Sequence, residues 1–175
     1  ENVKHSDEDL KNFKSIADQK DFRFKAIMAE LKKENIGINS LSAVVGRGGL
    51  LRSLKSGTYE VNQSMLNDMA EAKRGEHASN LGPIIADLIA KEAKTKAYIV
   101  DPVSVDEMED VARISGYPEI KRESLSHALN TKAVCKRYAN DAGKRYDDLN
   151  LIVAHLGSGI SVTAHRKGKM IDVVN

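Results

Sequence analysis

Short apolar runs alternate along this chain with stretches whose apolar residues recur at helical spacing. Residues 43–45, 97–100 and 149–154 are almost entirely apolar, which is typical of strands buried on both faces. Between the first two runs, residues 81–89 place apolar side chains on one helix face, and Pro83 falls in the first turn, where a helix tolerates proline. This alternation predicts an α/β fold with a mixed sheet and flanking helices.

Other segments extend this pattern. Ser6, with Asp9 three residues later, is typical of a helix N-terminus, and apolar residues at helical spacing follow as far as Ile16. Asn62 is placed to cap another helix. Further predicted helices cover residues 24–31, 62–69, 106–114 and 122–142, and further strands cover 57–61, 160–165 and 170–174, of which the last two form a hairpin.

The charge and the cysteine content exclude several classes of protein. Lys and Arg number 27 against 25 Asp and Glu, so the net charge of +2 offers no strong field to nucleic acid or to an anionic membrane. The single cysteine, Cys135, cannot form an internal disulfide, and no Cys/His spacing suits zinc. No apolar run approaches the roughly 20 residues of a bilayer span. We therefore expect a cytoplasmic protein that binds neither nucleic acid nor membranes.

Four acidic residues gather at positions 106, 107, 109 and 110, where a helix is predicted to begin. Because a helix N-terminus favours negative charge, we interpret them as a solvated capping cluster. Cys135 lies too far along the next helical pattern from His127 for a catalytic pair. We expect it to be a small buried residue.

A glycine-rich turn follows the predicted strand at 149–154. Gly157 and Gly159 flank the small Ser158, so backbone N–H groups could approach a phosphate without a bulky side chain in the way. Neither the helix that follows a dinucleotide-binding glycine motif nor the Gly-Lys-Ser/Thr of a nucleotide-binding loop is present. The pattern indicates either a phosphate cradle of another kind or an ordinary hairpin turn.

Two charged residues stand at the ends of predicted strands. Arg47, among glycines, could bind a carboxylate or a phosphate through its planar guanidinium, or it could be a surface arginine in a loop. Asp101 precedes Pro102, which favours an extended backbone, at the edge where open α/β sheets usually bind ligands. It is either a positioning or metal-linked carboxylate or part of an Asp-Pro turn.

Three histidines stand beside predicted elements. His77 opens a helix, His127 lies near the start of another, and His155 follows a strand. Histidine exchanges protons near neutral pH, but a lone histidine is more often a hydrogen-bonded structural group than a catalyst. The residues by themselves leave both roles open.

Six segments, taken in order, resemble the butyrate kinases of the acetokinase family. They are residues 44–51 (VVGRGGLL), 75–82 (GEHASNLG), 100–103 (VDPV), 108–116 (MEDVARISG), 127–130 (HALN) and 155–165 (HLGSGISVTAH). The likeness covers essentially the whole chain, which makes it more specific than any one glycine-rich turn. It implies part of the two-lobed fold that acetate kinase shares with sugar kinases, Hsp70 and actin.

The resemblance also implies a reaction. ATP, with Mg²⁺, would phosphorylate the carboxylate of butyrate or a similar short fatty acid, giving ADP and an acyl phosphate. Arg47 would hold the acyl carboxylate or the transferring phosphoryl group, Asp101 would orient the reacting groups near the metal, and His127 would stabilise the transition state. Homo-oligomers are implied as well.

The remaining family positions fall into two groups. His155, Gly157, Ser158 and Gly159 would line the phosphate turn. On the substrate side, His77 and Asn80 are further candidates. No residue is implied as a direct metal ligand.

The sequence departs from the family's pattern in several places. Ser126 replaces a large aromatic residue, Ser158 replaces a glycine, and Val174 replaces a polar residue. The family also has a strand and a phosphate turn before the matched region and a nucleotide-binding lobe after it. We therefore expect part of such a kinase, inactive by itself, with residues 1–148 in the acyl-binding lobe and 149–175 opening the nucleotide-binding lobe.

Two other interpretations stay open. The protein could be a kinase for acetate, propionate or a branched acid, which relative kcat/KM values across acids would resolve. It could instead be a non-catalytic fragment that folds or binds only with a partner segment. Titration of the chain with Mg-ATP separates this last class from an intact binding site.

Overall fold

The computed structural model describes residues 3–175, which form two compact units. Unit 1 comprises the residues up to Leu51 together with Thr58–Val100. Unit 2 comprises Arg52–Gly57 and Asp101–Asn175. The expected division into lobes at residue 148 concerns a longer protein and stays a prediction.

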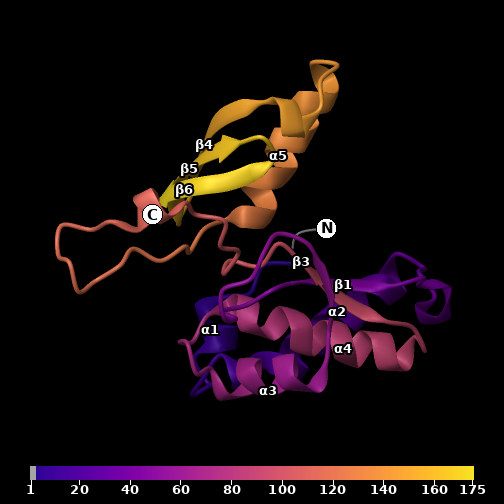
Figure 1. Ribbon diagram of the computed structural model, residues 1–175. Helices are drawn as coiled ribbons and strands as arrows, with labels where there is room; N and C mark the ends of the chain where they lie inside the picture. Colours follow the sequence, from indigo (N-terminus) through magenta and orange to yellow (C-terminus); the bar gives the residue numbers. More distant parts are fainter. Residues whose placement is uncertain (1–2) are drawn as a thin grey trace. The chain divides into compact units, whose positions relative to one another are not determined.

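Unit 1 contains a three-stranded mixed sheet in the order β1-β3-β2 (Figure 1). Strand β1 (Val44–Arg47) runs parallel to β3 (Ala97–Val100), and β2 (Thr58–Glu60) runs antiparallel to β3. Helix α4 (Leu81–Glu92) packs on β1 and β3, and its apolar stripe forms part of the core. The predicted α/β fold with a mixed sheet is confirmed in this unit.

Helix α4 approaches β1 so closely that glycine is required at the contact. A Cβ atom at Gly82 would lie 1.9 Å from the carbonyl oxygen of Arg47, and one at Gly46 would lie 2.4 Å from the carbonyl oxygen of Gly82. Neither neighbour can give way, because both are backbone atoms. The two glycines therefore fix where β1 ends and where Arg47 stands.

The other helices of unit 1 match their predicted signals only in part. Ser6 forms a reciprocal capping box with Asp9, as predicted, but α1 (Asp7–Leu10) ends well before Ile16. Ser15 and Asp18 exchange backbone-to-side-chain hydrogen bonds that favour a new turn, η1 (Ala17–Gln19). Four more elements of the unit are α2 (Lys20–Lys33), η2 (Ile38–Ser40), α3 (Gln63–Glu71), which the predicted Asn62 caps, and η3 (Ala78–Asn80).

Unit 2 contains a second sheet, which is antiparallel throughout. Strands β4 (Asn150–Leu156), β5 (Ile160–Arg166) and β6 (Lys169–Val174) lie side by side, and α5 (Ala128–Asp141) packs against β4 (Figure 1). The predicted hairpin is confirmed, and its two turn residues, Lys167 and Gly168, have positive φ values of 49° and 81°. Strand β4 pairs with β5 and not with the sheet of unit 1, so the chain contains two separate sheets.

One face of this second sheet carries exposed apolar side chains. Ile152 and Leu156 on β4 are each 74% exposed, and Ile160, Val162 and Val174 on the neighbouring strands are also exposed. The sequence predicted a strand at 149–154 buried on both faces. In the structure its residues are partly buried on the side that α5 covers and exposed on the other side.

The acidic cluster is not a solvated cap. Asp106 pairs with Arg113, Glu109 pairs with Arg166, and Glu107 pairs with Lys132, whereas only Asp110 has a fully exposed side chain. The predicted helix at 106–114 is reduced to η4 (Asp110–Arg113) because these carboxylates bind cations and the backbone elsewhere in unit 2. Arg113 and the Met108 N–H hold the pKa of Asp106 below its ordinary value, against the upward effect of burial.

Helix α5 begins at Ala128 and not near residue 122. The preceding Ser124 and Ser126 are buried in an extended segment, where Ser124 Oγ donates to the Val105 carbonyl and the Ser126 N–H donates to the Val103 carbonyl. These long-range bonds replace the helical bonds that the sequence pattern predicted. The helix ends at Asp141, just before Gly143, as expected.

A buried polar network connects α5 to the inner face of the β4–β6 sheet. Lys132, 2% exposed, lies 2.7 Å from Glu107 and donates to the Gly168 carbonyl. Nearby, His165 is 2% exposed, with Nδ1 2.6 Å from the Tyr146 hydroxyl of η5 (Tyr146–Asp148) and Nε2 2.7 Å from Thr163 Oγ1. Because Thr163 donates to the Val153 carbonyl, its oxygen accepts from His165, and Tyr146 donates to the ring.

The His165 ring makes stability depend on pH. Burial and the Lys132 charge lower its pKa from 6.5 to about 4, although Glu107 acts in the opposite sense. Below pH 6.5 the unfolded chain therefore binds a proton at this histidine and the folded chain does not. The free energy of unfolding decreases as the pH is lowered from 6.5 to about 4, by about 3 kcal/mol at most. Urea unfolding at a series of pH values should show this fall. In the His165→Asn variant, most of this decrease should be absent between pH 6.5 and 5, above the pH range in which most carboxylates titrate.

Candidate functional site

Two of the predicted histidines form a stacked pair in unit 2. His127 is the N-cap residue of α5, and His155 lies within β4, one residue before its end, and not after it as predicted. Their ring centroids are 3.8 Å apart, and the ring planes differ by 8°. His127 Nδ1 lies 2.9 Å from Ser161 Oγ, and His155 Nδ1 lies 3.0 Å from Asn130 Oδ1. Each imidazole is thus held by a second side chain.

The glycine-rich turn lies directly against these rings. The β4–β5 pairing closes at Leu156 and Ile160, so residues 157–159 form the connection, and Ser158 is exposed. A Cβ atom at Gly159 would lie 2.9 Å from Cε1 and Nε2 of His127, and one at Gly157 would lie 3.7 Å from Nε2 of His155. The absence of a side chain at Gly159 lets the turn approach the His127 ring, whereas the contact at Gly157 is an ordinary one. Backbone N–H groups beside imidazole nitrogens suit an anion such as phosphate.

Asp101 has a strained backbone and a fixed carboxylate. Its φ is +39°, so the expectation of an extended residue before Pro102 is wrong. The side chain is buried, and Oδ1 accepts bonds from the Ser56 hydroxyl at 2.6 Å and from the Gly57 N–H at 2.8 Å. The Asp101 N–H in turn donates to the Gly57 carbonyl. These bonds hold the strained conformation and orient the carboxylate.

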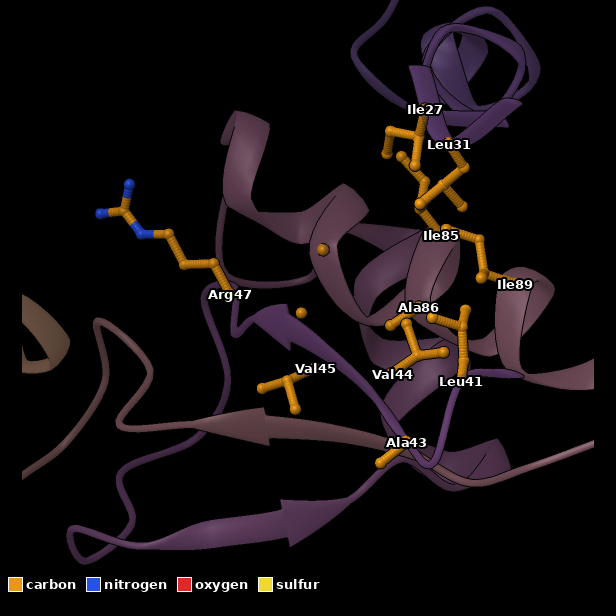
Figure 2. Close-up of a pocket in the computed structure, with 12 residues that line it drawn as sticks. Ile27, Leu31, Leu41, Ala43, Val44, Val45, Arg47, Ile85, Ala86 and Ile89 are labelled. Atoms are coloured by element: carbon orange, nitrogen blue, oxygen red, sulfur yellow. The ribbon is translucent and has the colours of Figure 1, made fainter. Parts of the chain in front are cut away.

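Arg47 is the last residue of β1 in unit 1 and is exposed. A cavity of about 420 Å³, lined mostly by apolar residues of α2, β1 and α4, lies beside it. Figure 2 shows the Arg47 side chain extending away from Ile27, Leu31 and Ile85, which line that cavity. The guanidinium is therefore available to a ligand outside the cavity.

His77 and Asn80 have structural contacts in unit 1. His77 is the N-cap of η3, and its Nδ1 accepts from the Ser79 N–H at 3.1 Å. Asn80 is buried; its Oδ1 accepts from the Leu50 N–H and its Nδ2 donates to the Gly75 carbonyl. Asn80 thereby connects the loop after β1 to the turn before η3. Their substrate-side roles stay predictions.

The structure brings together four of the predicted site residues, His127, His155, Gly157 and Gly159, with Ser158 between the glycines. Asp101 belongs to the same unit, whereas Arg47, His77 and Asn80 belong to unit 1. Sequence reasoning missed Ser161, Asn130 and Ser56. Only Ser161 carried a signal, because the alternation along 160–165 places it on the same face as Thr163 and His165.

Residues 3–175 contain no group of three or more His, Cys, Asp and Glu side chains that could hold a metal ion. In the same part of the chain, no helix is long and apolar enough to cross a bilayer. Cys135 is buried, as predicted, and burial raises the pKa of its thiol.

Comparison with known proteins gives consistent results at three levels. The sequence signature described as the Acetokinase family matches residues 120–174. Butyrate kinase 2 and butyrate kinase 1 of Clostridium acetobutylicum are each 55% identical to the chain, over 175 and 173 residues respectively, which is 100% and 99% of this chain and 49% of each relative. A probable butyrate kinase of Coprothermobacter proteolyticus is 51% identical and is likewise covered to 49%.

Solved structures show the same fold at lower identity. Acetate kinase of Porphyromonas gingivalis matches with a TM-score of 0.67 and 20% identity, over 87% of this chain and 41% of that one. A propionate kinase of Francisella tularensis matches with a TM-score of 0.64 and 22% identity, over 88% and 41%. The chain spans about half the length of the curated relatives it matches. In sequence the whole chain is similar to butyrate kinases, residues 120–174 match the signature of the Acetokinase family, and the fold is similar to those of acetate and propionate kinases.

Proposed function

We propose that the full-length protein, meaning a protein of its relatives' length that contains this chain, is a butyrate kinase. It transfers the terminal phosphoryl group of ATP to the carboxylate of butyrate and releases ADP and butyryl phosphate. The observation that carries the proposal is the 55% identity to butyrate kinases over the whole chain. The stacked imidazoles beside the glycine turn support it, because phosphoryl transfer needs donors arranged in advance around the transferring group.

In this proposal, residues of unit 2 bind and stabilise the phosphoryl group. The N–H groups of residues 157–159 donate hydrogen bonds to its oxygens, and His127 donates another as charge spreads over those oxygens in the transition state. The His155 ring stacks on that of His127, and its Nε2 faces the same turn at Gly157. Ser158 adds a hydroxyl donor where the family pattern has glycine.

The remaining site residues position the reactants. The planar guanidinium of Arg47 binds the acid carboxylate or the phosphoryl oxygens in two parallel hydrogen bonds. Asp101 keeps its orientation through Ser56 and Gly57 and directs one carboxylate oxygen toward the reactants. We keep His77 and Asn80 as substrate-side candidates that act by holding the loop after β1.

The described residues fit Mg-ATP as a phosphate-bound cofactor. Mg²⁺ in phosphoryl-transfer sites is typically held by one or two carboxylates plus substrate phosphates. Asp101 is the carboxylate that would hold it, directly or through water. The metal supplies charge neutralisation on the phosphate oxygens. We further propose a cytoplasmic location, as the cysteine content of the sequence indicated, and a homo-oligomeric assembly, as the family resemblance implied.

Acid preference is a separate part of the proposal. The similar solved structures are those of acetate and propionate kinases. Ser126, next to His127, is small and buried, and its Oγ lies 3.4 Å from Met170 Sδ. We place butyrate first on sequence identity. Values of kcat/KM for acetate, propionate, butyrate and isobutyrate decide the order. A clear maximum at another acid would replace butyrate as the substrate.

The His127→Ala variant tests the site. In the full-length protein, acyl phosphate formation from ATP and butyrate should fall about 100-fold, because one prearranged donor to the transition state is lost. Trapping the product with hydroxylamine measures the rate. His5→Ala is the matched control, because it also removes an imidazole but His5 contacts Phe22 in unit 1 and is not one of the proposed site residues. Absence of turnover by the unmodified protein with any short acid would contradict the proposed function.

A further inference from the structure

The inner face of β5 carries three polar side chains that are almost completely buried: Ser161 and Thr163 are 0% exposed and His165 is 2% exposed. Buried polar groups need hydrogen-bonding partners. Thr163 and His165 find theirs in the network with Tyr146. Ser161 lies farther along the strand and contacts His127 instead, so its role differs from that of its two neighbours.

Ser161 contacts His127 twice. Its Oγ lies 2.9 Å from the ring Nδ1 and 3.4 Å from the backbone N of the same residue. The backbone N–H only donates, so Oγ accepts that bond and keeps one hydroxyl hydrogen to donate. The ring Nδ1, 2.9 Å away, is placed to accept this hydrogen. A neutral His127 ring is then protonated at Nε2.

The second ring of the pair has the opposite arrangement. His155 Nδ1 lies 3.0 Å from Asn130 Oδ1, and an amide oxygen only accepts, so His155 carries its proton on Nδ1. Two positive charges on rings stacked 3.8 Å apart would repel each other strongly. The two rings therefore differ: neutral His127 donates through Nε2, and His155 donates through Nδ1 to Asn130.

We propose that Ser161 is a positioning residue that fixes the tautomer and orientation of His127, so that Nε2–H faces the Gly157–Gly159 turn. The direction follows from Gly159, where a Cβ atom would lie 2.9 Å from His127 Nε2. A ring oriented in this way donates to an anion in the turn without first being protonated. The assignment of the His127 tautomer does not depend on the proposed kinase function, whereas the effect of Ser161 on catalysis rests on that function.

Nitrogen NMR of the histidine-labelled chain, above the pKa of free histidine, tests the tautomer directly. The shifts of ring nitrogens separate a protonated from a bare nitrogen, and His127→Gln identifies the signals of His127 among the five histidines. We expect protonation at Nε2 in the unmodified chain and a mixture of tautomers in Ser161→Ala. Ser161→Thr, which keeps the hydroxyl, should restore Nε2. A His127 protonated at Nδ1 in the unmodified chain would overturn the proposal, even if Ser161→Ala failed to fold.

Kinetics of the full-length protein test the consequence. Ser161→Ala should lower kcat about tenfold with little change in KM, the size of effect seen when a residue that orients a reacting group is removed. The pH profile of kcat should change as well, because the hydrogen bond that holds His127 in one tautomer is lost. Ser161→Thr should recover both quantities.

Ser124→Ala is the matched control. It also removes a buried hydroxyl from unit 2, but the Ser124 hydroxyl donates to the Val105 carbonyl. It should leave the His127 tautomer and the pH profile unchanged. An equal change in both serine variants would show a general packing effect and overturn the positioning role. The expected tautomers without kinase turnover would contradict the proposed function and leave the Ser161 assignment intact.

Discussion

Replacing Lys132 with Met is expected to lower the free energy of unfolding by about 3–5 kcal/mol. Lys132 is 2% exposed and lies 2.7 Å from Glu107, whose side chain is 13% exposed. Without the ammonium, Glu107 becomes a charge in the interior of unit 2 with no cation to balance it. The Gly168 carbonyl in the hairpin turn loses a donor as well. Urea unfolding of the chain, followed by circular dichroism near pH 7, measures the loss.

A double variant separates the charge from the packing. Lys132→Met with Glu107→Leu removes both charges together, and buried ion pairs replaced by apolar residues of similar size often cost little. The double variant should therefore recover most of the stability that the single variant loses. An equal loss in both would show that packing of the lysine stem, and not the unbalanced carboxylate, is responsible.

Lys91→Met is the control for this experiment. Lys91 makes an ion pair of similar length, 2.6 Å to Asp87, but its side chain is 68% exposed. Exposed pairs are screened by water and contribute at most about 1 kcal/mol. The comparison isolates burial as the source of the large effect at Lys132.

Arg47→Ala should reduce kcat/KM for butyrate phosphorylation about 1000-fold in the full-length protein, if the proposed function holds. The reason is loss of the planar guanidinium that binds the carboxylate or phosphoryl oxygens. Arg47→Lys should recover only part of the activity, because an ammonium cannot form the two parallel bonds. Steady-state kinetics of both variants, with the two substrates varied in turn, provide the measurement.

Stability measurements distinguish this role from a structural one. Arg47 is exposed and extends away from the apolar side chains beside it, so neither variant should change the melting temperature noticeably (Figure 2). Arg137→Ala, at a side chain that is 86% exposed, is the control and should have near-normal kinetics. Near-normal kinetics in Arg47→Ala would remove Arg47 from the site.

Local sequence patterns predicted most elements whose signals lie within a few residues. Strand β3, the hairpin of β5 and β6, helix α4 and the caps at Ser6 and Asn62 all follow from apolar periodicity, turn chemistry or capping. The predictions for 106–114 and for the start of α5 failed because ion pairs and backbone bonds to distant segments outweigh a weak helical pattern. The prediction of an extended backbone at Asp101 was wrong for a similar reason, because hydrogen bonds to Ser56 and Gly57 hold the residue in a strained conformation.

For the candidate site, the sequence by itself determined which residue types stand next to strands and glycines, and the family that they resemble. Only the tertiary structure decided that His127 and His155 stack, that Gly159 must lack a side chain beside them, and that Ser161 and Asn130 hold the two rings. These contacts join residues 25 to 34 positions apart in the chain. Periodicity and capping report only on neighbours within a turn or a strand, so they do not register a contact that strand pairing and helix packing create.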